Sequence, residues 1–471
     1  MNKLYIYILA LCLLAACNDF EDDINVNPNQ PSQASNTQLL ANAMRYLPGI
    51  SSSAYGPLYP QHLSETEYTD ASRYNTIYFD FYSYYTGPLM NIQKVLDSDE
   101  LNANEGPIAN QLAVAKILKA YFFWFMTDRW GDLPYSEALQ GKEDFTPAYD
   151  SQEDIYNALF SLLDEANAQI VDGDIENDIV YGGDTDKWRR LGNTIHMLMA
   201  LRLSEVDPAT ASTEFNKAMD AGTFTSNDDN LVYQHLADAD NWNYWYNVFE
   251  NLNREWYAVS KPLVDYMKPL NDPRLPTFAE PNVDGEYVGL AYGLPGDVAN
   301  TGQYSKDSIS ILGANLRQAT TPVYLVTYAE ALFAQAEAAK RGWIGGGNAA
   351  AEEYYTTAIE ASVQQWNGNT DGLESFLAQA EVQYNAEDAI EKIAYQKWVH
   401  LFMHGYEAWA EWRRTGFPIL SPPENNSGRD IPLRQAYPTQ EFQNNQDNYQ
   451  EAVQRAFGGE DEPEKSVWWD K

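Results

Sequence analysis

The chain has 471 residues, 44% of them hydrophobic, with 68 acidic and 30 basic side chains. This content is enough for a large buried core, and the formal net charge of −38 makes nucleic acid a poor partner, because such a surface repels phosphate backbones. The chain has two cysteines, and both precede residue 20. No disulfide framework is therefore possible, and stability must come from core packing.

The start of the chain has the pattern of a signal peptide. Lys3 precedes an apolar stretch, residues 4–16, that is too short to cross a bilayer as a helix. The stretch ends in Leu14-Ala15-Ala16-Cys17, which resembles the lipobox of bacterial lipoproteins. The alternative is a plain signal peptide with a chance cysteine. We predict a lipoprotein signal peptide over 1–16, lipidation (palmitate) at Cys17, and a tether over 17–36.

The six residues after Cys17 indicate where in the cell the protein is placed. Residues 18–23, Asn-Asp-Phe-Glu-Asp-Asp, resemble the acidic export tag that sends some lipoproteins to the outer leaflet of the outer membrane. Several acyl chains would anchor the protein firmly, since one chain alone binds a membrane only marginally. We expect a lipid-anchored protein of the outer membrane that faces the cell exterior.

Helical spacing of apolar residues dominates the remaining chain. It predicts helices over 107–129, 151–170, 187–205, 208–221, 324–341, 348–366 and 387–414. Several form consecutive pairs with small alanine positions inside them, a pattern that looks like tetratricopeptide packing without a strict 34-residue period. We predict one mainly α domain over 37–471, with a tetratricopeptide-like helical scaffold, few short strands and long irregular loop-rich elaborations. The loops over 222–250 and 270–320 are the segments where function is expected.

The search for catalytic chemistry finds no constellation. His400 and His404 lie four apart in the predicted helix 387–414, but a zinc protease would need Glu where Leu401 stands. A metal site with Glu407 as third ligand stays open beside the interpretation that these histidines only pack helices. The chain has no phosphate loop and no Gly-x-Ser-x-Gly elbow. We predict a non-enzymatic protein without cofactor or metal.

One turn carries a family resemblance. Residues 130–135, Trp-Gly-Asp-Leu-Pro-Tyr, closely resemble a signature of the SusD/RagB family of outer-membrane nutrient-binding lipoproteins. Agreement with its SusD-like branch extends, in chain order, over 181–193, 328–342, 407–418 and 431–441. In these motifs we interpret Trp130 and Tyr135 as packing the turn, and Arg413 and Arg414 as pairing with acidic neighbours.

The resemblance implies a role. Such lipoproteins have a tetratricopeptide-like helical scaffold, cap a TonB-dependent (SusC-like) barrel transporter and hand it oligomeric nutrients, usually glycans and sometimes peptides. We therefore expect a carbohydrate-binding protein of nutrient uptake with that transporter as partner. The alternatives are a peptide-binding member of the same family, a lipid-anchored glycan hydrolase, and a structural lipoprotein without a ligand.

Two stretches are unusually aromatic outside clean helical patterns: 73–85, RYNTIYFDFYSYY, and 240–247, DNWNYWYN. Tyr and Trp rings offer sugars an apolar plane with a hydrogen-bonding rim, and Asn side chains donate to and accept from hydroxyl groups. The predicted ligand-binding residues are Asn241, Trp242, Asn243, Tyr244 and Trp245, with Tyr78 and Tyr82 as further candidates. The alternative is that these rings belong to the core.

Overall fold

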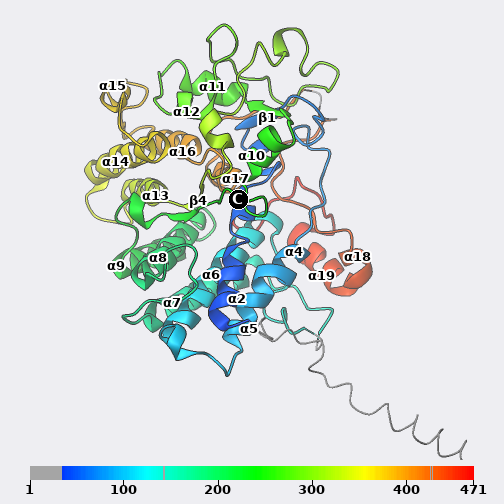
Figure 1. Ribbon diagram of the computed structural model, residues 1–471, viewed down its shortest axis with the longest axis vertical. Coiled ribbons are helices and arrows are strands. Elements are labelled where there is room, and N and C mark those ends of the chain that lie inside the picture. Colours follow the sequence, from blue (N-terminus) through cyan, green and yellow to red (C-terminus); the bar gives the residue numbers. More distant parts are fainter. Residues whose placement is uncertain (1–33, 142–143, 425, 427) are drawn as a thin grey trace, which may run out of the picture.

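The computed structural model describes residues 34–141, 144–424, 426 and 428–471 (Figure 1). The predicted signal peptide, the lipidation site Cys17 and nearly all of the predicted tether lie outside the described residues. In the described part of the chain, no helix combines the length and the apolar character needed to cross a membrane.

The described chain is mainly helical. The helices of its first half are α2 (Asn36–Met44), α3 (Pro48–Ser51), α4 (Tyr82–Tyr84), α5 (Met90–Leu96), α6 (Ile108–Trp130), α7 (Gln152–Gln169), α8 (Thr185–Arg202) and α9 (Pro208–Ala221). Those of its second half are α10 (Tyr244–Tyr246), α11 (Lys261–Met267), α12 (Leu275–Phe278), α13 (Tyr328–Arg341), α14 (Gly347–Asn367), α15 (Leu373–Leu377), α16 (Ala389–His400), α17 (Gly405–Thr415), α18 (Glu441–Asn444) and α19 (Gln446–Phe457).

Four short strands pair into two ribbons. Antiparallel β1 (Leu63–Glu65) and β3 (Tyr257–Val259) form one, and antiparallel β2 (Leu231–Tyr233) and β4 (Val323–Val326) form the other. Each ribbon joins segments that are far apart in sequence. The prediction of a mainly α fold with few short strands is confirmed.

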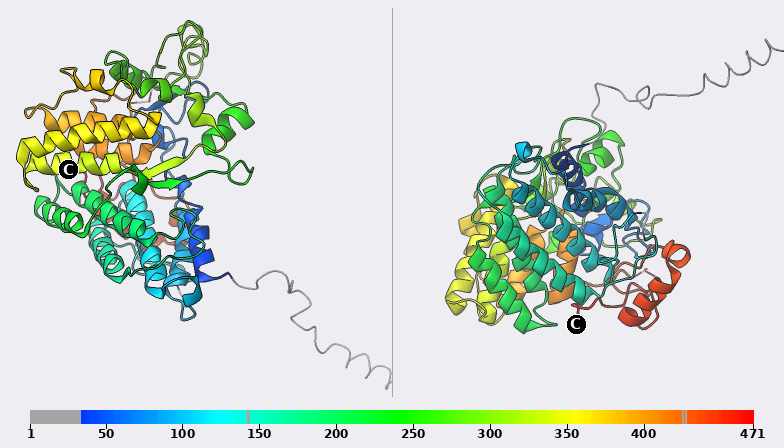
Figure 2. Two further views of the ribbon diagram at one scale, coloured as in Figure 1. Left: turned by 60° about the vertical axis from the view of Figure 1, so that its left-hand side comes forward. Right: turned by 90° about the horizontal axis from the view of Figure 1, so that it is seen from below.

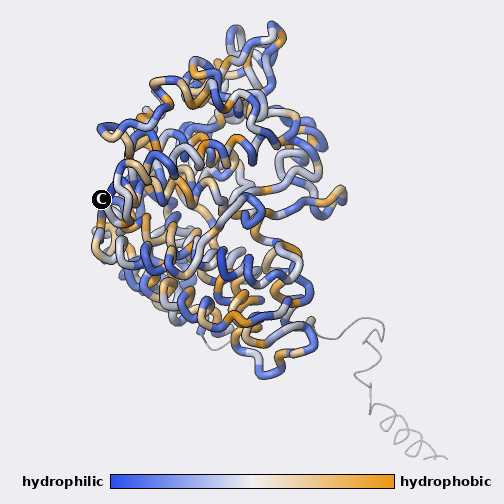
Figure 3. Tube along the Cα trace, turned by 90° about the vertical axis from the view of Figure 1, so that its left-hand side faces the viewer, coloured by the Kyte–Doolittle hydropathy of each residue, from blue (hydrophilic) through white to orange (hydrophobic). Residues whose placement is uncertain are grey.

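The long helices pack as consecutive pairs that stack on one another. α6 packs on α7, α8 on α9, α13 on α14 and α16 on α17, while α8 and α13 connect neighbouring pairs. Figures 1 and 2 show this stack on one side of the molecule, with the loop-rich segments around α10, α11 and β1 on the other. Hydrophobic and hydrophilic residues alternate along the outer helices, as expected for helices with one buried face (Figure 3).

Local sequence sets where these helices begin and end. Ser151 caps α7 by accepting a hydrogen bond from the backbone N–H of Asp154, and Thr327 caps α13 in the same way. α13 ends at Gly342 in the left-handed conformation, which glycine adopts without strain. The buried alanines of α13 let neighbouring helices approach closely, and they contribute to two separate core clusters.

Two predicted helix boundaries are wrong. The predicted helix 387–414 is two helices, α16 and α17, because Gly405 packs directly against the backbone of Gly56. A Cβ on Gly405 would lie 2.2 Å from the Gly56 carbonyl carbon, and Met403 just before it has a φ of +70°. His400 and His404 therefore do not share one helix face. The predicted helix 324–341 begins only at Tyr328, because residues 323–326 are β4.

The Trp-Gly-Asp turn connects three helices. Trp130 is fully buried with its ring edge-on to Phe81, and Tyr135 packs edge-on against Phe123. The Asp132 carboxylate accepts hydrogen bonds from the Gln152 backbone N–H at 2.8 Å and from the Arg455 guanidinium at 2.7 Å. The turn therefore fixes the end of α6 against the start of α7 and the last turn of α19, which confirms its structural interpretation.

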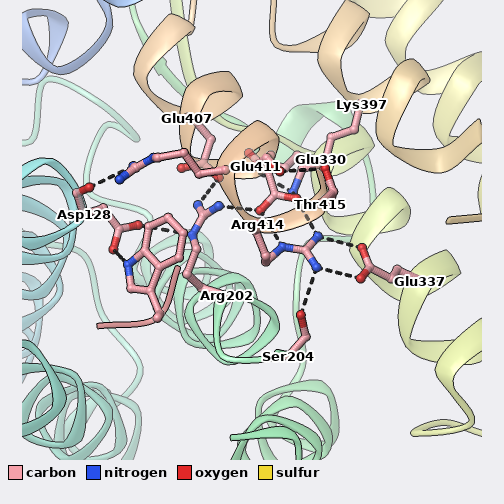
Figure 4. Close-up of polar contacts among 12 residues, drawn as sticks. Asp128, Arg202, Ser204, Glu330, Glu337, Lys397, Glu407, Glu411, Arg414 and Thr415 are labelled. Atoms are coloured by element: carbon pink, nitrogen blue, oxygen red, sulfur yellow. Dashed lines mark hydrogen bonds and ion pairs between the residues drawn. The ribbon is translucent and has the colours of Figure 1, made fainter. Parts of the chain in front are cut away.

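A cluster of buried charges lies where α8, α13, α16 and α17 meet (Figure 4). The Arg414 guanidinium donates to Glu337 at 2.6 and 2.7 Å and to Glu411 at 2.7 Å. Lys397 Nζ lies 3.1 Å from a Glu411 oxygen, and Arg202 pairs with Glu411 and Glu407. Arg414 thus pairs with acidic neighbours as predicted. Arg413 instead donates to backbone carbonyls and lies over the rings of Trp409 and Trp469.

The surroundings shift the pKa values of two carboxyl groups in this cluster in opposite directions. Burial opposes ionisation of Glu411, but Arg414 and two other cations outweigh burial and hold its pKa well below the usual range. Burial raises the pKa of Glu330 to about 8, although Lys397 partly offsets this. These carboxyl groups are enclosed in the core and serve to join helices.

Candidate functional site

The aromatic stretch 73–85 is divided between two surfaces. Residues 77–79 run beside Ala436, with the Ala436 N–H donating to the Ile77 carbonyl and the Phe79 N–H donating to the Ala436 carbonyl. Successive side chains of an extended segment point in opposite directions. Tyr78 lies near Tyr449, whereas the Phe79 ring lies edge-on to Tyr55 at 4.9 Å.

Tyr82 lines a separate, largely apolar pocket of about 280 Å³ beside α18. Its hydroxyl donates to the buried carboxylate of Glu441, which also accepts from the Tyr149 hydroxyl at 2.5 Å. Tyr78 and Tyr82 therefore lie apart from Phe79, on the side of the molecule that α18 and α19 occupy. Their role in ligand binding stays a prediction.

The second stretch, 240–247, forms α10 and the turn before it. Trp245 is 3% exposed and packs among Phe249 and Tyr257 in a core cluster, so its ring is not available to a ligand. Trp242 and Tyr244 are half-buried and keep accessible ring surface. The prediction of a ligand platform is thus corrected for Trp245, because helical geometry turns it inward.

The two predicted asparagines hold the local backbone. The Asn243 side chain caps α10 by accepting from the Trp245 N–H at 2.8 Å, and it donates to the Thr321 carbonyl at 3.0 Å. Asn241 accepts from the Leu236 N–H at 2.9 Å and donates to the Tyr233 hydroxyl at 2.7 Å. Both side chains have intramolecular partners that account for their position.

Partly exposed rings from three loops and from α10 lie near one another, and we call this set the aromatic face. Its members are Tyr55, Tyr68, Phe79, Tyr244 and Trp256. Tyr68 lies edge-on to Trp256 with ring centres 5.0 Å apart, and the Arg254 guanidinium lies 4.5 Å from the centre of the Trp256 ring. Burial raises the pKa of Tyr244, the nearby hydroxyls of Tyr406 and Tyr55 raise it further, and Arg254 lowers it, so these groups lie close together.

The β1–β3 ribbon brings these loops together. Glu65 pairs with Tyr257 across the ribbon, and beyond it the Thr66 N–H donates to the Trp256 carbonyl at 2.8 Å. Tyr257 points into the core, so its neighbour Trp256 points outward. Tyr68 is 71% exposed, so most of its ring surface is accessible.

A buried carboxyl group holds the loop that carries Tyr68. Glu65 Oε2 accepts from the Ser72 backbone N–H at 2.8 Å and from the Ser72 hydroxyl at 2.9 Å. Burial raises the pKa of Glu65 to about 7, and these two hydrogen bonds offset only part of that effect. The hydrogen bonds between Glu65 and Ser72 therefore hold the loop in place, which positions Tyr68 beside Trp256.

The histidines and acidic residues offer no metal centre in the described ranges. No group of three or more His, Cys, Asp or Glu side chains there is placed to hold a metal ion. His400 Nε2 lies 2.7 Å from the Thr327 hydroxyl, and its Nδ1 lies 2.9 Å from the Ser362 hydroxyl. Burial lowers the pKa of His404 to about 4. Both histidines are buried between helices.

Sequence reasoning missed Tyr55, Tyr68 and Trp256. A signal for Tyr68 exists, because it is a lone ring in the polar run Ser64-Glu-Thr-Glu-Tyr-Thr-Asp, where burial would be costly. Trp256 follows Asn253-Arg-Glu, again in polar surroundings. Few other aromatic residues surround Tyr68 or Trp256 in the sequence. Stretches 73–85 and 240–247 stand out because many aromatic residues lie close together in them.

Known proteins share both the sequence pattern and this architecture. A family model described as starch-binding and associating with the outer membrane, SusD-like, matches residues 28–438. The chain belongs to the SusD-like family. No curated protein sequence matches this SusD-like chain.

Solved structures agree with this membership. A protein titled chitin-binding is 32% identical over 92% of this chain and 98% of its own, with a TM-score of 0.78. A SusD homologue from Bacteroides fragilis is 27% identical over 92% of this chain and 100% of its own, with a TM-score of 0.79. A chitin-binding SusD homologue from Flavobacterium johnsoniae is 25% identical over 93% and 98%, with a TM-score of 0.77.

Proposed function

We propose that this SusD-like protein captures oligosaccharide chains at the cell surface and delivers them to a TonB-dependent barrel transporter. The observation that carries the proposal is the aromatic face, in which loops present partly exposed rings on a rigid helical body. Ring planes match the weakly polar C–H faces of sugars. Membership in a family described as starch-binding, and likeness to proteins titled chitin-binding, support the same ligand class.

The proposed ligand residues are a revised set. Trp256, Tyr68, Tyr244 and Phe79 supply the stacking surface, and Trp242, half-buried in the turn before α10, adds a further accessible ring. Asp70 and Asn75, whose side chains are hydrogen-bonded to each other at 2.9 Å, lie exposed in the loop that follows Tyr68 and offer hydroxyl partners. Trp245 is excluded from the set because it is core.

Titration calorimetry with chito-oligosaccharides and malto-oligosaccharides tests this assignment. The double variant Tyr68→Ala, Trp256→Ala should bind the preferred oligosaccharide at least about tenfold more weakly, since the loss of two stacking rings removes at least about 1.4 kcal/mol. Tyr354→Ala is the matched control, because Tyr354 is a half-buried ring on α14 in the helical stack and belongs to neither aromatic stretch. Equal weakening in both proteins, or none in either, would contradict the aromatic face.

Anchoring and delivery complete the proposal. Leu14-Ala15-Ala16-Cys17 is the lipidation signal, so Cys17→Ser should move the protein from the outer-membrane fraction to the soluble fraction or leave it unprocessed. Mild-detergent pull-down of the wild-type protein from the same cells should recover a large β-barrel protein. Recovery of the lipoprotein alone, with the barrel shown to be expressed, argues against the transporter partner. An intact 1–16 segment on wild-type protein argues against the anchor.

A further inference from the structure

Two hollows lie along α11, a helix that Figure 1 shows in the loop-rich part of the molecule. These hollows, of about 730 and 560 Å³, adjoin and share the lining residues Lys261, Asp265, Ala291 and Tyr304. They therefore form one continuous depression, which we call the α11 groove. α11 and Tyr304 border it, residues 287–294 form its floor, and residues 419–423 border its far end. Each hollow has the volume of an ordinary ligand pocket.

Two glycines fix the floor of the α11 groove. A Cβ on Gly289 would lie 2.5 Å from Lys261 Cα, and a Cβ on Gly293 would lie 2.3 Å from Pro423 Cβ, so both backbones are packed without space for a side chain. Between them, the Leu290 N–H donates to the Val259 carbonyl at 2.9 Å, and the Lys261 N–H donates to the Leu290 carbonyl at 2.7 Å. The groove is thus pre-formed and rests on β3.

The two lysines along the groove are already paired with carboxylates, whereas no ion pair among the described residues joins the exposed carboxylate of Glu424 at its far end. Lys261 forms an ion pair with Asp265, and Lys268 Nζ lies 2.8 Å from a Glu286 oxygen. A strongly charged chain would find no unpaired opposite charge on these residues. A sugar hydroxyl can accept from the ammonium group and donate to the carboxylate of the same pair. The lining therefore favours an uncharged, hydroxyl-rich chain over an acidic peptide.

Two tyrosines add stacking surface. Tyr287 and Tyr304 line the groove and are both half-buried, so part of each ring is accessible. The small side chain of Ala291 lies on the floor beside them, which lets a flat ring approach the backbone. Aromatic walls over a small-residue floor suit pyranose rings.

A short loop connects the groove to the aromatic face. Lys306, two residues after Tyr304, lies 3.4 Å from a Glu67 oxygen and 3.6 Å from a Glu255 oxygen. Glu67 precedes Tyr68 and Glu255 precedes Trp256 in the sequence. Residues 304–306 therefore span from the groove to the two most prominent members of the aromatic face.

We propose that the α11 groove is a second carbohydrate site, which binds the continuation of a chain held on the aromatic face. This inference rests on the function proposed above. Two linked sites on one polymer raise its affinity by avidity, whereas an oligosaccharide too short to reach both gains nothing. The groove thereby selects long chains over short ones.

Binding of long and short ligands to groove variants tests the proposal. Tyr304→Ala removes a wall, and Ala291→Trp fills the point where the two hollows meet. Each should weaken binding to colloidal chitin or soluble starch, whichever the wild-type protein binds, by at least about tenfold. Binding of the matching tetrasaccharide should change by less than about twofold. Tyr354→Ala is the control, because Tyr354 is also half-buried but lies on α14 in the helical stack.

The outcomes separate the two proposals. If the wild-type protein binds the polymer and neither variant binds it more weakly, the groove is not a carbohydrate site. The proposal for the aromatic face is unaffected by that result. Equal losses for polymer and tetrasaccharide overturn the long-chain role. No binding of any glycan by the wild-type protein overturns both proposals. If Ala291→Trp fails to fold, as judged by its melting curve, Tyr304→Ala still decides, because Tyr304 is in a surface loop.

Discussion

The helical body and the aromatic face use the same residue types in opposite ways. In the body, Trp130 and Arg414 are fully buried and have several partners each. On the face, Tyr68 is mostly exposed, and Trp256 is half-buried, packed on one side against the core cluster of Trp245 and in contact with Tyr68 and Arg254. A buried charge must be paired or the fold loses several kcal/mol, whereas an exposed ring can be removed at little cost. Stability and binding are therefore expected to reside in different residues.

The buried charges should give the largest effect. Arg414→Ala would leave Glu337 and Glu411 buried without their main partner, and we expect it to lower the free energy of unfolding by about 3–5 kcal/mol. Lys217→Ala, which removes an exposed pair with Asp164, should cost at most about 1 kcal/mol. Urea unfolding followed by circular dichroism measures both. Similar losses in the two variants would remove the distinction between body and surface.

Two tryptophans compare core and face directly. Trp245→Ala should lower the free energy of unfolding by about 3–5 kcal/mol, because the ring is enclosed in a core cluster. Trp256→Ala should cost about 1 kcal/mol or less while weakening oligosaccharide binding. Thermal unfolding and calorimetry on both variants give the comparison. If Trp245→Ala stays fully stable and only loses ligand affinity, the assignment of Trp245 to the core is wrong.

The smallest effect concerns pH and the aromatic face. The pKa of Glu65 is raised to about 7 in the folded state from an ordinary value of 4.5, so the folded state holds its proton more tightly. The stability that this group contributes is complete below about pH 4.5 and is lost as the pH rises through about 7. Glu65→Gln removes this dependence, so from pH 5 to pH 8 it should gain about 1–3 kcal/mol relative to wild type.

Unfolding curves at several pH values measure this gain. Glu176→Gln, at an exposed position, serves as the control and should follow the wild-type curve. Parallel curves for Glu65→Gln and wild type would show that Glu65 does not hold its proton more tightly in the fold. The Tyr68 loop would then need another explanation for its fixed position.

Most of the helical body could be predicted from local sequence. Apolar spacing, with the cap Ser151 for α7, predicts α7 and α13 within a few residues, because these signals act over one or two turns. The break between α16 and α17 could not be placed in this way. It depends on contact between Gly405 and Gly56, which are far apart in sequence.

Local patterns of residues were enough to predict the helix pairs, the Trp-Gly-Asp turn, the family resemblance and the presence of aromatic segments in polar loops. They were not enough to predict which rings face solvent. Trp245 points inward and Trp256 outward because α10 and the β1–β3 ribbon each fix a direction, and the ribbon pairs residues 63–65 with 257–259. Ring density is a property of neighbouring residues, whereas exposure depends on partners brought from elsewhere in the chain.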